Sequence, residues 1–436
     1  MKKLKNSLGL RLTIIAVLTL VLLIPSLLIQ NLIYERENRR NSVAREISQK
    51  WGQEQTVIGP VLSIPYTHSF TSEGQTQQTI RYAHFLPENL NVKGSIAPEV
   101  RYRGIYKAIV YNSVLSFSGN FPALDFDNLN VSEDELIMED AFISVGISDM
   151  TGIKDFITVQ WDDKTFQANP GITSNDIVAS GISIAPDFDP NSEHSFQFDL
   201  NLNGSSSLKF APVGKETILK LESTWDTPSF TGTFLPTERE VSESGFTASW
   251  EVLHLNRNFP QQWQGPNTEV SNASFGAELL LGVDEYQKTM RTAKYAIMFI
   301  SLTFLTFFMI ELLGKKRIHP VQYLLIGFAL LVFYTLLLSI SEYIVFKFAY
   351  LIAAAAIIGL ISVYSFRVVG DALKTGIVSG ILILLYGYLY ILLQLQDYAL
   401  LMGSIGLFVV LALVMYLTRH VDWFEVMSNP SGEEID

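Results

Sequence analysis

Two glutamates are the residues whose type and position best suit chemistry within the apolar part of this chain. Glu311 and Glu342 lie near the ends of long apolar runs, and an ionisable side chain in a membrane region is costly and often functional. Simpler accounts exist for both. Glu311 precedes Lys315 by four residues, a spacing typical of an ion pair on one helix face, and Glu342 at the membrane interface would cost little. Both glutamates are candidate functional residues.

The segment Pro260-Gln261-Gln262-Trp263 supplies two further candidates, Gln261 and Trp263. Exposed, this loop would bind a partner through the indole ring, because Trp is enriched among the residues that dominate binding energy. Buried, the same ring would anchor a turn. The sequence alone leaves both interpretations open.

The motifs of common enzyme and metal sites are absent from the sequence. It contains no Gly-rich phosphate loop, no G-x-S-x-G elbow and no H-E-x-x-H motif. Zero cysteines exclude disulfides, zinc–thiolate sites, Fe–S clusters and a Cys nucleophile. The six histidines do not cluster in sequence, and the acidic runs at 133–135 and 187–189 fit solvated loops better than calcium sites. We therefore predict no catalytic residue, no cofactor and no metal site.

Apolar runs that suit transmembrane helices frame the chain. A spanning helix needs about 20 largely apolar residues, and residues 12–33 contain no charge. This run is longer than the apolar core of a signal peptide and lacks a small-residue cleavage pattern, which favours an uncleaved anchor. Five more spans are predicted within a bundle at 294–418, at 295–313, 323–341, 348–364, 376–393 and 398–417.

The basic residues between these runs predict the orientation of the chain. They lie at Lys315, Lys316 and Arg317, at Arg367 and Lys374, and at Arg419 and His420. The positive-inside rule places such loops in the cytoplasm. Alternation then makes residues 1–11 and the tail 419–436 cytoplasmic, and residues 34–293 periplasmic. Arginines also follow the first span on its outer side, which large domains tolerate.

The segment 34–293 reads as an acidic, water-facing β-domain. It holds 34 acidic and 19 basic residues, a net charge of −15, which disfavours nucleic-acid binding. Apolar and polar residues alternate in 115–118, 196–202 and 246–250, the period of half-buried antiparallel strands. We predict a large all-β, sandwich-like domain, with residues 34–52 continuing the first helix outward. The fold class is thus a six-helix (1 + 5) membrane bundle plus this β-domain.

Short strings spread over nearly the whole chain resemble the CreD family of bacterial inner-membrane proteins. They are Trp51-Gly52 with Gln55, Gly59-Pro60-Val61-Leu62, Ile64-Pro65-Tyr66, Arg103-Gly104-Ile105-Tyr106, Ser118-Gly119-Asn120-Phe121, Pro228-Ser229-Phe230, Phe234-Leu235-Pro236, Pro260-Gln261 with Trp263, His319-Pro320-Val321-Gln322-Tyr323, Ser341-Glu342, Asp397-Tyr398-Ala399-Leu400-Leu401 and Asp422-Trp423-Phe424. Their order and spacing make the resemblance specific. One departure is that Tyr343 and Val345 stand where the family usually has a His and a Gly, so no role of that histidine carries over.

The resemblance implies an inner-membrane protein linked to envelope integrity and an envelope-stress regulon, with no established enzymatic activity. Together with the residues, it predicts a non-enzymatic protein whose periplasmic domain binds a protein partner or an envelope component, and whose helices contact membrane lipids. The alternative is a transporter or lipid-handling protein that uses the helix bundle. A membrane hydrolase would need a nucleophile–base pair that the sequence does not reveal.

Overall fold

The computed structural model of the chain describes residues 8–72, 75–126, 129, 131, 135–280, 285–314, 318–395 and 398–419. The chain forms two compact units, one made of residues 1–39 and 283–436 and the other of residues 40–282. We call them the helical unit and the β unit. Parts of the predicted cytoplasmic segments, residues 1–7 and 420–436, and the basic loop at 315–317 lie outside the described residues.

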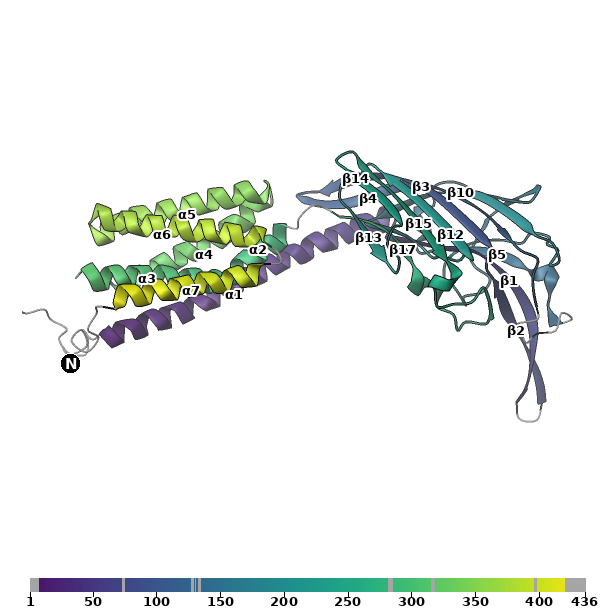
Figure 1. The fold of residues 1–436 in the computed structure, drawn as a ribbon, viewed down its shortest axis with the longest axis horizontal. Helices are drawn as coiled ribbons and strands as arrows, with labels where there is room; N and C mark the ends of the chain where they lie inside the picture. Colours follow the sequence, from purple (N-terminus) through teal and green to yellow (C-terminus); the bar gives the residue numbers. More distant parts are fainter. Residues whose placement is uncertain are drawn as a thin grey trace, which may run out of the picture. The chain divides into compact units, whose positions relative to one another are not determined.

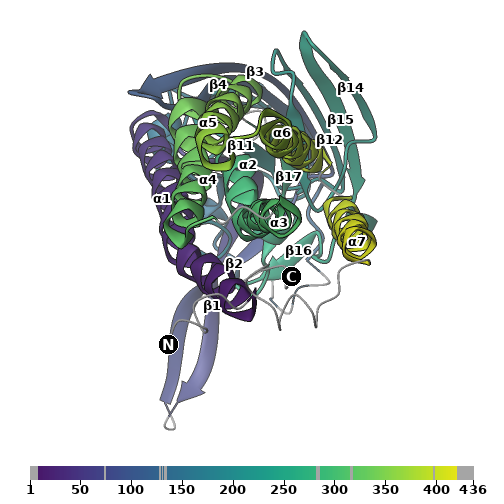
Figure 2. The same cartoon turned by 90° about the vertical axis from the view of Figure 1, so that its left-hand side faces the viewer.

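The helical unit consists of helices, most of which are apolar (Figures 1 and 2). They are α1 (Leu8–Trp51, whose last residues belong to the β unit), α2 (Glu285–Lys294), α3 (Ala296–Gly314), α4 (Pro320–Ser341), α5 (Phe346–Val369), α6 (Ala372–Gln394) and α7 (Ala399–Thr418). Four of them, α1, α4, α5 and α6, are long and apolar enough to cross a membrane. The pair α2 and α3, bent by 44°, makes a fifth if it is one span.

The predicted total of six spans in a 1 + 5 arrangement remains a prediction. Within the described residues, α7 contributes a shorter apolar helix at Leu401–Tyr416. The predicted span at 295–313 begins at the bend between α2 and α3. The helix predicted for residues 34–52 is confirmed, since α1 runs without interruption to Trp51.

Apolar side chains cover the outside of these helices as well as their inside. Exposed examples on α5 and α6 include Leu351, Val363, Leu384 and Ile391, whereas the interior is built from aromatic rings such as Phe299, Phe333 and Tyr386. A helix that is apolar all round belongs in a hydrocarbon environment or a large core. These surfaces therefore suit lipid contact.

Helix α1 packs against α4 at Gly327. A Cβ at Gly327 would lie 2.2 Å from Cδ1 of Leu22, and Leu22 itself is fully buried. Small residues let helix backbones approach closely in lipid. The absence of a side chain at Gly327 therefore permits the close approach of α1.

The β unit contains two large sheets (Figure 1). In strand order, the nine-stranded sheet is β13 (Pro228–Gly232), β17 (Phe275–Leu279), β11 (Ser207–Phe210), β1 (Gln55–Ser72), β5 (Phe142–Ile147), β9 (Gly181–Ile184) and β8 (Asn169–Pro170), with β2 (Gln75–Phe85) paired to β1 and β16 (Gln262–Gln264) paired to β2. The eight-stranded sheet is β14 (Glu238–Ser242), β15 (Gly245–Leu253), β12 (Glu216–Ser223), β3 (Asn89–Arg103), β4 (Tyr106–Phe121), β10 (His194–Ser205), β6 (Thr158–Trp161) and β7 (Lys164–Gln167).

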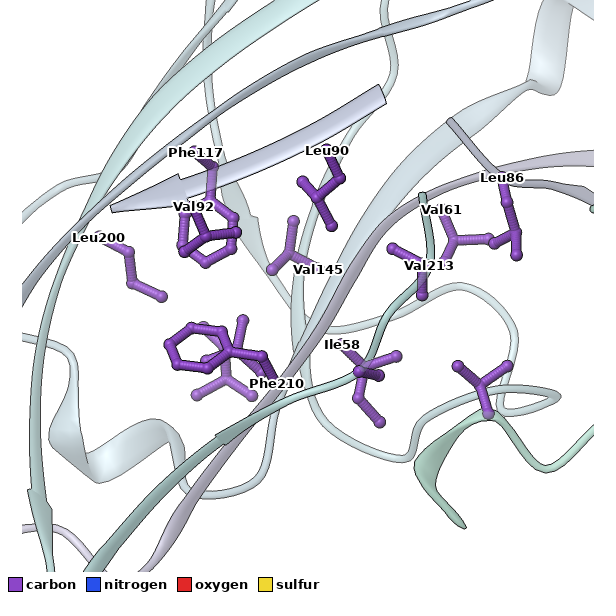
Figure 3. Packing of buried hydrophobic residues seen from close by; sticks show 14 of the residues in the cluster. Ile58, Val61, Leu86, Leu90, Val92, Phe117, Val145, Leu200, Phe210 and Val213 are labelled. Carbon is purple, nitrogen blue, oxygen red and sulfur yellow. The ribbon is translucent and has the colours of Figure 1, made fainter. Parts of the chain in front are cut away.

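One hydrophobic core joins the inner faces of both sheets. Figure 3 shows Val92, Phe117 and Leu200 of the eight-stranded sheet near Val145 and Phe210 of the nine-stranded sheet. Buried and exposed residues alternate along β10, β12 and β15, as predicted for β10 and β15. The eight-stranded sheet therefore has one apolar face on the core and one polar face toward solvent.

Candidate functional site

Glu342 follows the last residue of α4 and is held by two other helices. Its Oε1 accepts a hydrogen bond of 3.1 Å from the Tyr286 hydroxyl on α2 and lies 3.9 Å from Nη1 of Arg36 on α1. The Glu342 side chain is 9% exposed and that of Arg36 45%. The carboxylate thus joins three helices at one end of the bundle.

Glu311 has a matching set of partners at the other end of the same unit. Its Oε1 accepts from Arg11 Nη1 on α1 at 2.7 Å, and its Oε2 accepts from the Tyr323 hydroxyl on α4 at 3.2 Å. The Glu311 side chain is 6% exposed. Lys315, the partner that the sequence suggested, lies outside the described residues.

The two clusters share one composition, an Arg from α1 with a Glu and a Tyr from the other helices. Arg11 and Arg36 are 25 residues apart, which is about 37 Å along a helix, a little more than the hydrocarbon thickness of about 30 Å. Both carboxylates are therefore bound at the ends of the bundle. This arrangement ties α1 to the other helices and does not resemble a relay of charges through a membrane midplane.

Gln261 acts as part of a clip within the β unit. Its side-chain amide donates to Pro87 O at 2.9 Å, and its Oε1 accepts from Nη2 of Arg257. Arg257 also donates to Phe259 O at 2.6 Å, and burial lowers its pKa to about 10. The Arg257 guanidinium is still charged at neutral pH. Losing one of the oxygen atoms that accept its hydrogen bonds would therefore destabilise the β unit.

Trp263 is buried and lies in a row of side chains across three strands. It is 7% exposed and pairs in register with His84 on β2, which pairs with Ser63 on β1. The indole and imidazole centroids are 5.3 Å apart. The ring therefore packs inside the β unit, and the interpretation of Trp263 as an exposed contact loses its basis.

His84 brings together a serine, a histidine and an aspartate that the sequence did not single out. Ser63 Oγ lies 2.9 Å from His84 Nδ1, and Asp176 Oδ2 lies 3.2 Å from His84 Nε2. Burial lowers the pKa of His84 in spite of Asp176, so the neutral imidazole is present at neutral pH.

This trio has the composition of a hydrolase triad but not its access. Ser63 and His84 are each 1% exposed and lie within paired strands. An acyl-transfer nucleophile must reach a carbonyl carbon beside preorganised oxyanion donors, and Ser63 faces the interior. The trio therefore fits a structural hydrogen-bond chain. Among the described residues, no group of three or more His, Asp or Glu has the arrangement of a metal site.

A hollow on the solvent face of the eight-stranded sheet is the feature of the β unit best suited to a ligand. It measures 760 Å³ and lies over β3, β4, β12, β15 and β14, within the range of small-molecule sites. An adjoining hollow of 470 Å³ shares Ser95, Glu222, Glu240 and Thr247 with it. We call this region the outer-face groove and define it by the charged side chains on this face, Lys93, Lys220, Glu222, Glu238 and Glu240. Arg239 of β14 pairs with inward-facing Ala248, and its guanidinium lies over the Phe230 ring on the other face.

The strand register sorts these charges within the groove. Lys93 on β3 and Lys220 on β12 are direct partners in a parallel pair, so two like charges stand side by side, an arrangement that destabilises a sheet. Glu222 follows Lys220 by two residues on the same face, and Glu238 and Glu240 lie on β14 beyond β15. Within the described parts of the chain, no salt bridge joins any two of these five groove residues.

A turn with a special backbone closes one end of the groove wall. Gly245, at the start of β15, has φ +133°, and a Cβ there would lie 2.0 Å from Ser223 O. Only glycine fits this close approach. The position helps to hold β14 and β15 beside β12.

Comparison with known proteins gives one consistent result. The family model described as "Inner membrane protein CreD" matches residues 7–424. The chain is 35% identical over 431 residues to a protein of Escherichia coli (strain K12) named "Inner membrane protein CreD", with 97% of this chain and 95% of that protein covered. The similarity thus spans both units.

Proposed function

This chain belongs to the CreD family of inner membrane proteins, and we propose from that premise that it supports the integrity of the bacterial cell envelope as a non-enzymatic binding protein. Its β unit lies in the periplasm and binds an envelope component, and its helices anchor that unit in the membrane. The outer-face groove is the observation that carries the proposal, because it is a ligand-sized hollow lined by charges that form no salt bridge among the described residues.

The competing functions lack comparable support among the described residues. A transport pathway needs charges or broken helices near the membrane midplane, whereas Glu311 and Glu342 are bound at opposite ends of the bundle. A hydrolase needs an accessible nucleophile, and Ser63 is buried. Binding of a ligand in the outer-face groove requires neither charges at the membrane midplane nor an accessible nucleophile.

Filling the groove tests the function in cells. We expect a strain that carries Thr247→Trp, which places a large ring in the hollow, to be as sensitive to detergents and cell-wall antibiotics as a strain that lacks the protein. Thr247 is exposed on β15, so the fold should tolerate the change. The measurement is survival at matched protein levels.

Gln197→Trp is the matched control, because Gln197 is an exposed residue of β10 in the same sheet and does not line the groove. It should behave like the unmodified strain. Normal survival of the strain that lacks the protein would refute the envelope role. Normal survival of Thr247→Trp alone would refute the role of the groove.

The absence of cysteine allows a clean test of the orientation. One variant, Ser244→Cys, places a thiol in the exposed turn between β14 and β15. A second variant, Ser428→Cys, places a thiol in the C-terminal tail. In cells with a permeable outer membrane, a membrane-impermeant maleimide should label the thiol at position 244 at once and the thiol at position 428 only after lysis. The reverse pattern would show that the β unit is cytoplasmic.

A further inference from the structure

The pair Lys93–Lys220 is the strongest clue to what the outer-face groove binds. Neighbouring strands are about 4.8 Å apart, so the two lysine side chains leave the same face of the sheet side by side. Neither lysine has a salt bridge within the described residues. A sheet gains nothing from this repulsion, so a bound anion is what would turn the pair into a favourable contact.

Two adjacent lysines favour a phosphate over a carboxylate as the bound anion. A phosphate monoester carries a charge of about −1.5 to −2 at neutral pH and three acceptor oxygens, whereas a carboxylate carries one charge and two oxygens. Two lysines match the phosphate. Lysine is also a common phosphate-binding residue, acting as a point charge.

The rest of the groove calls for a positive group on the same ligand. Glu222 lies two residues from Lys220 on β12, about 7 Å along the strand, and Glu238 and Glu240 line the hollow from β14. None of these three carboxylates has a salt bridge among the described residues. On β15, Ser249 pairs with Lys220 on one side and with Glu238 on the other, so its hydroxyl lies between the two kinds of charge. An anion alone would be repelled by these acids.

Resting on the proposed function, we propose that the outer-face groove binds a zwitterion of the phosphoethanolamine type, with its phosphate on Lys93 and Lys220 and its ammonium toward Glu222 and the acids of β14. Charge complementarity fixes both ends. The ammonium donates hydrogen bonds to carboxylates, which a trimethylated amine does not do. The groove would therefore recognise the phosphate by its negative charge and the ammonium by its N–H donors.

Isothermal titration of the full-length protein in a maltoside detergent tests this assignment, with free O-phosphoethanolamine as the probe. We expect saturable binding, weakened about tenfold or more by Lys93→Gln and by Lys220→Gln, because each removes a charge-assisted contact. Lys164→Gln is the matched control on β7 of the same sheet, where the lysine pairs with Asp187 outside the groove. It should leave binding unchanged.

Two further probes separate the contribution of the phosphate from that of the ammonium N–H groups. β-Alanine carries a carboxylate in place of the phosphate, and phosphocholine lacks N–H donors. Both should bind more weakly than O-phosphoethanolamine, and Glu222→Gln should reduce the preference over phosphocholine. Equal binding of β-alanine would overturn the phosphate assignment, and unchanged binding by Lys93→Gln/Lys220→Gln, or no binding of O-phosphoethanolamine, would overturn the site.

These outcomes are distinct from those of the proposed function. Failure of O-phosphoethanolamine to bind, combined with a stress-sensitive Thr247→Trp strain, would leave the groove as the functional site and refute only its ligand. Normal survival without the protein would refute the envelope role whatever the titration gives.

Discussion

Replacing Trp263 with alanine will lower the free energy of unfolding of the β unit by about 3–5 kcal/mol, the usual loss for a buried aromatic side chain. The indole is 7% exposed, lies 5.3 Å from the His84 ring and belongs to β16, a three-residue strand whose pairing partner in the sheet is β2. Its loss leaves a cavity beside His84 and removes the main packing contact of β16. The short strand is then expected to detach from β2.

The measurement is denaturant unfolding of the full-length protein, with hydrogen exchange of the β2 and β16 peptides to locate the loss. Trp263→Phe should be far milder, because it keeps an aromatic ring and removes Nε1, a buried N–H group without an acceptor among the described residues. Leu255→Ala is the surface control, since Leu255 is 80% exposed. Unchanged stability of Trp263→Ala together with loss of a bound partner would restore the loop-contact interpretation.

Strands whose one face is buried were predictable from the sequence alone. The alternation in 196–202 and 246–250 reflects the period of two along β10 and β15, and burial of one face enforces that period in any such strand. Apolar length likewise identified α4, α5 and α6. These are local properties, written in consecutive residues.

The groove could not be predicted, because its geometry is non-local. Lys93 and Lys220 are neighbours only through the parallel pairing of β3 with β12, and no pattern near either lysine specifies the other strand. The same limit hid the partner of Glu311. Arg11, 300 positions away, contacts Glu311, and no pattern near either residue points to the other; the pairing with Lys315 stays a prediction.

The Ser63–His84 contact lies between these cases. The two residues are 21 positions apart and belong to one hairpin, β1 and β2. The register of that hairpin would have placed them opposite each other, but the long polar run of residues 71–79 does not fix from its composition where one strand ends and the next begins. Asp176 comes from a separate loop, which only the tertiary fold places nearby.

Removing the positive charge of Arg11 is expected to destabilise the helical unit by about 2–3 kcal/mol, measured for Arg11→Gln. A buried carboxylate that loses its partner is left uncompensated at a typical loss of about 3–5 kcal/mol, and the 26% exposure of Arg11 reduces this figure. Tyr323 still donates one hydrogen bond to Glu311, but a neutral donor does not balance the charge. Unfolding by SDS titration in mixed micelles is a suitable measurement.

The loss of stability from Glu311→Gln should be smaller than the loss from Arg11→Gln. This difference would identify burial of the carboxylate as the cause of the larger loss. Glu311→Gln leaves a partly exposed arginine, whose long side chain can reach water, and the amide oxygen of the substituted side chain still accepts from Tyr323. Arg11→Gln/Glu311→Gln should therefore be more stable than Arg11→Gln alone, because it removes the unpaired buried charge. A double variant that is the sum of the two single losses would show that the 2.7 Å contact is not energetically coupled.

The second cluster supplies the control within the same protein. Arg36→Gln removes a base that is 45% exposed and lies 3.9 Å from Glu342. This contact is longer and its base more solvated than in the 2.7 Å pair of Arg11 with Glu311, so we expect a loss of only about 0–1 kcal/mol. A small loss there beside a large loss for Arg11→Gln would fit a bundle whose first helix is fixed mainly at the Glu311 end. If Glu311 served transport, its substitution would instead leave stability unchanged and abolish flux. The unfolding measurement therefore distinguishes a carboxylate that anchors α1 from one that takes part in transport.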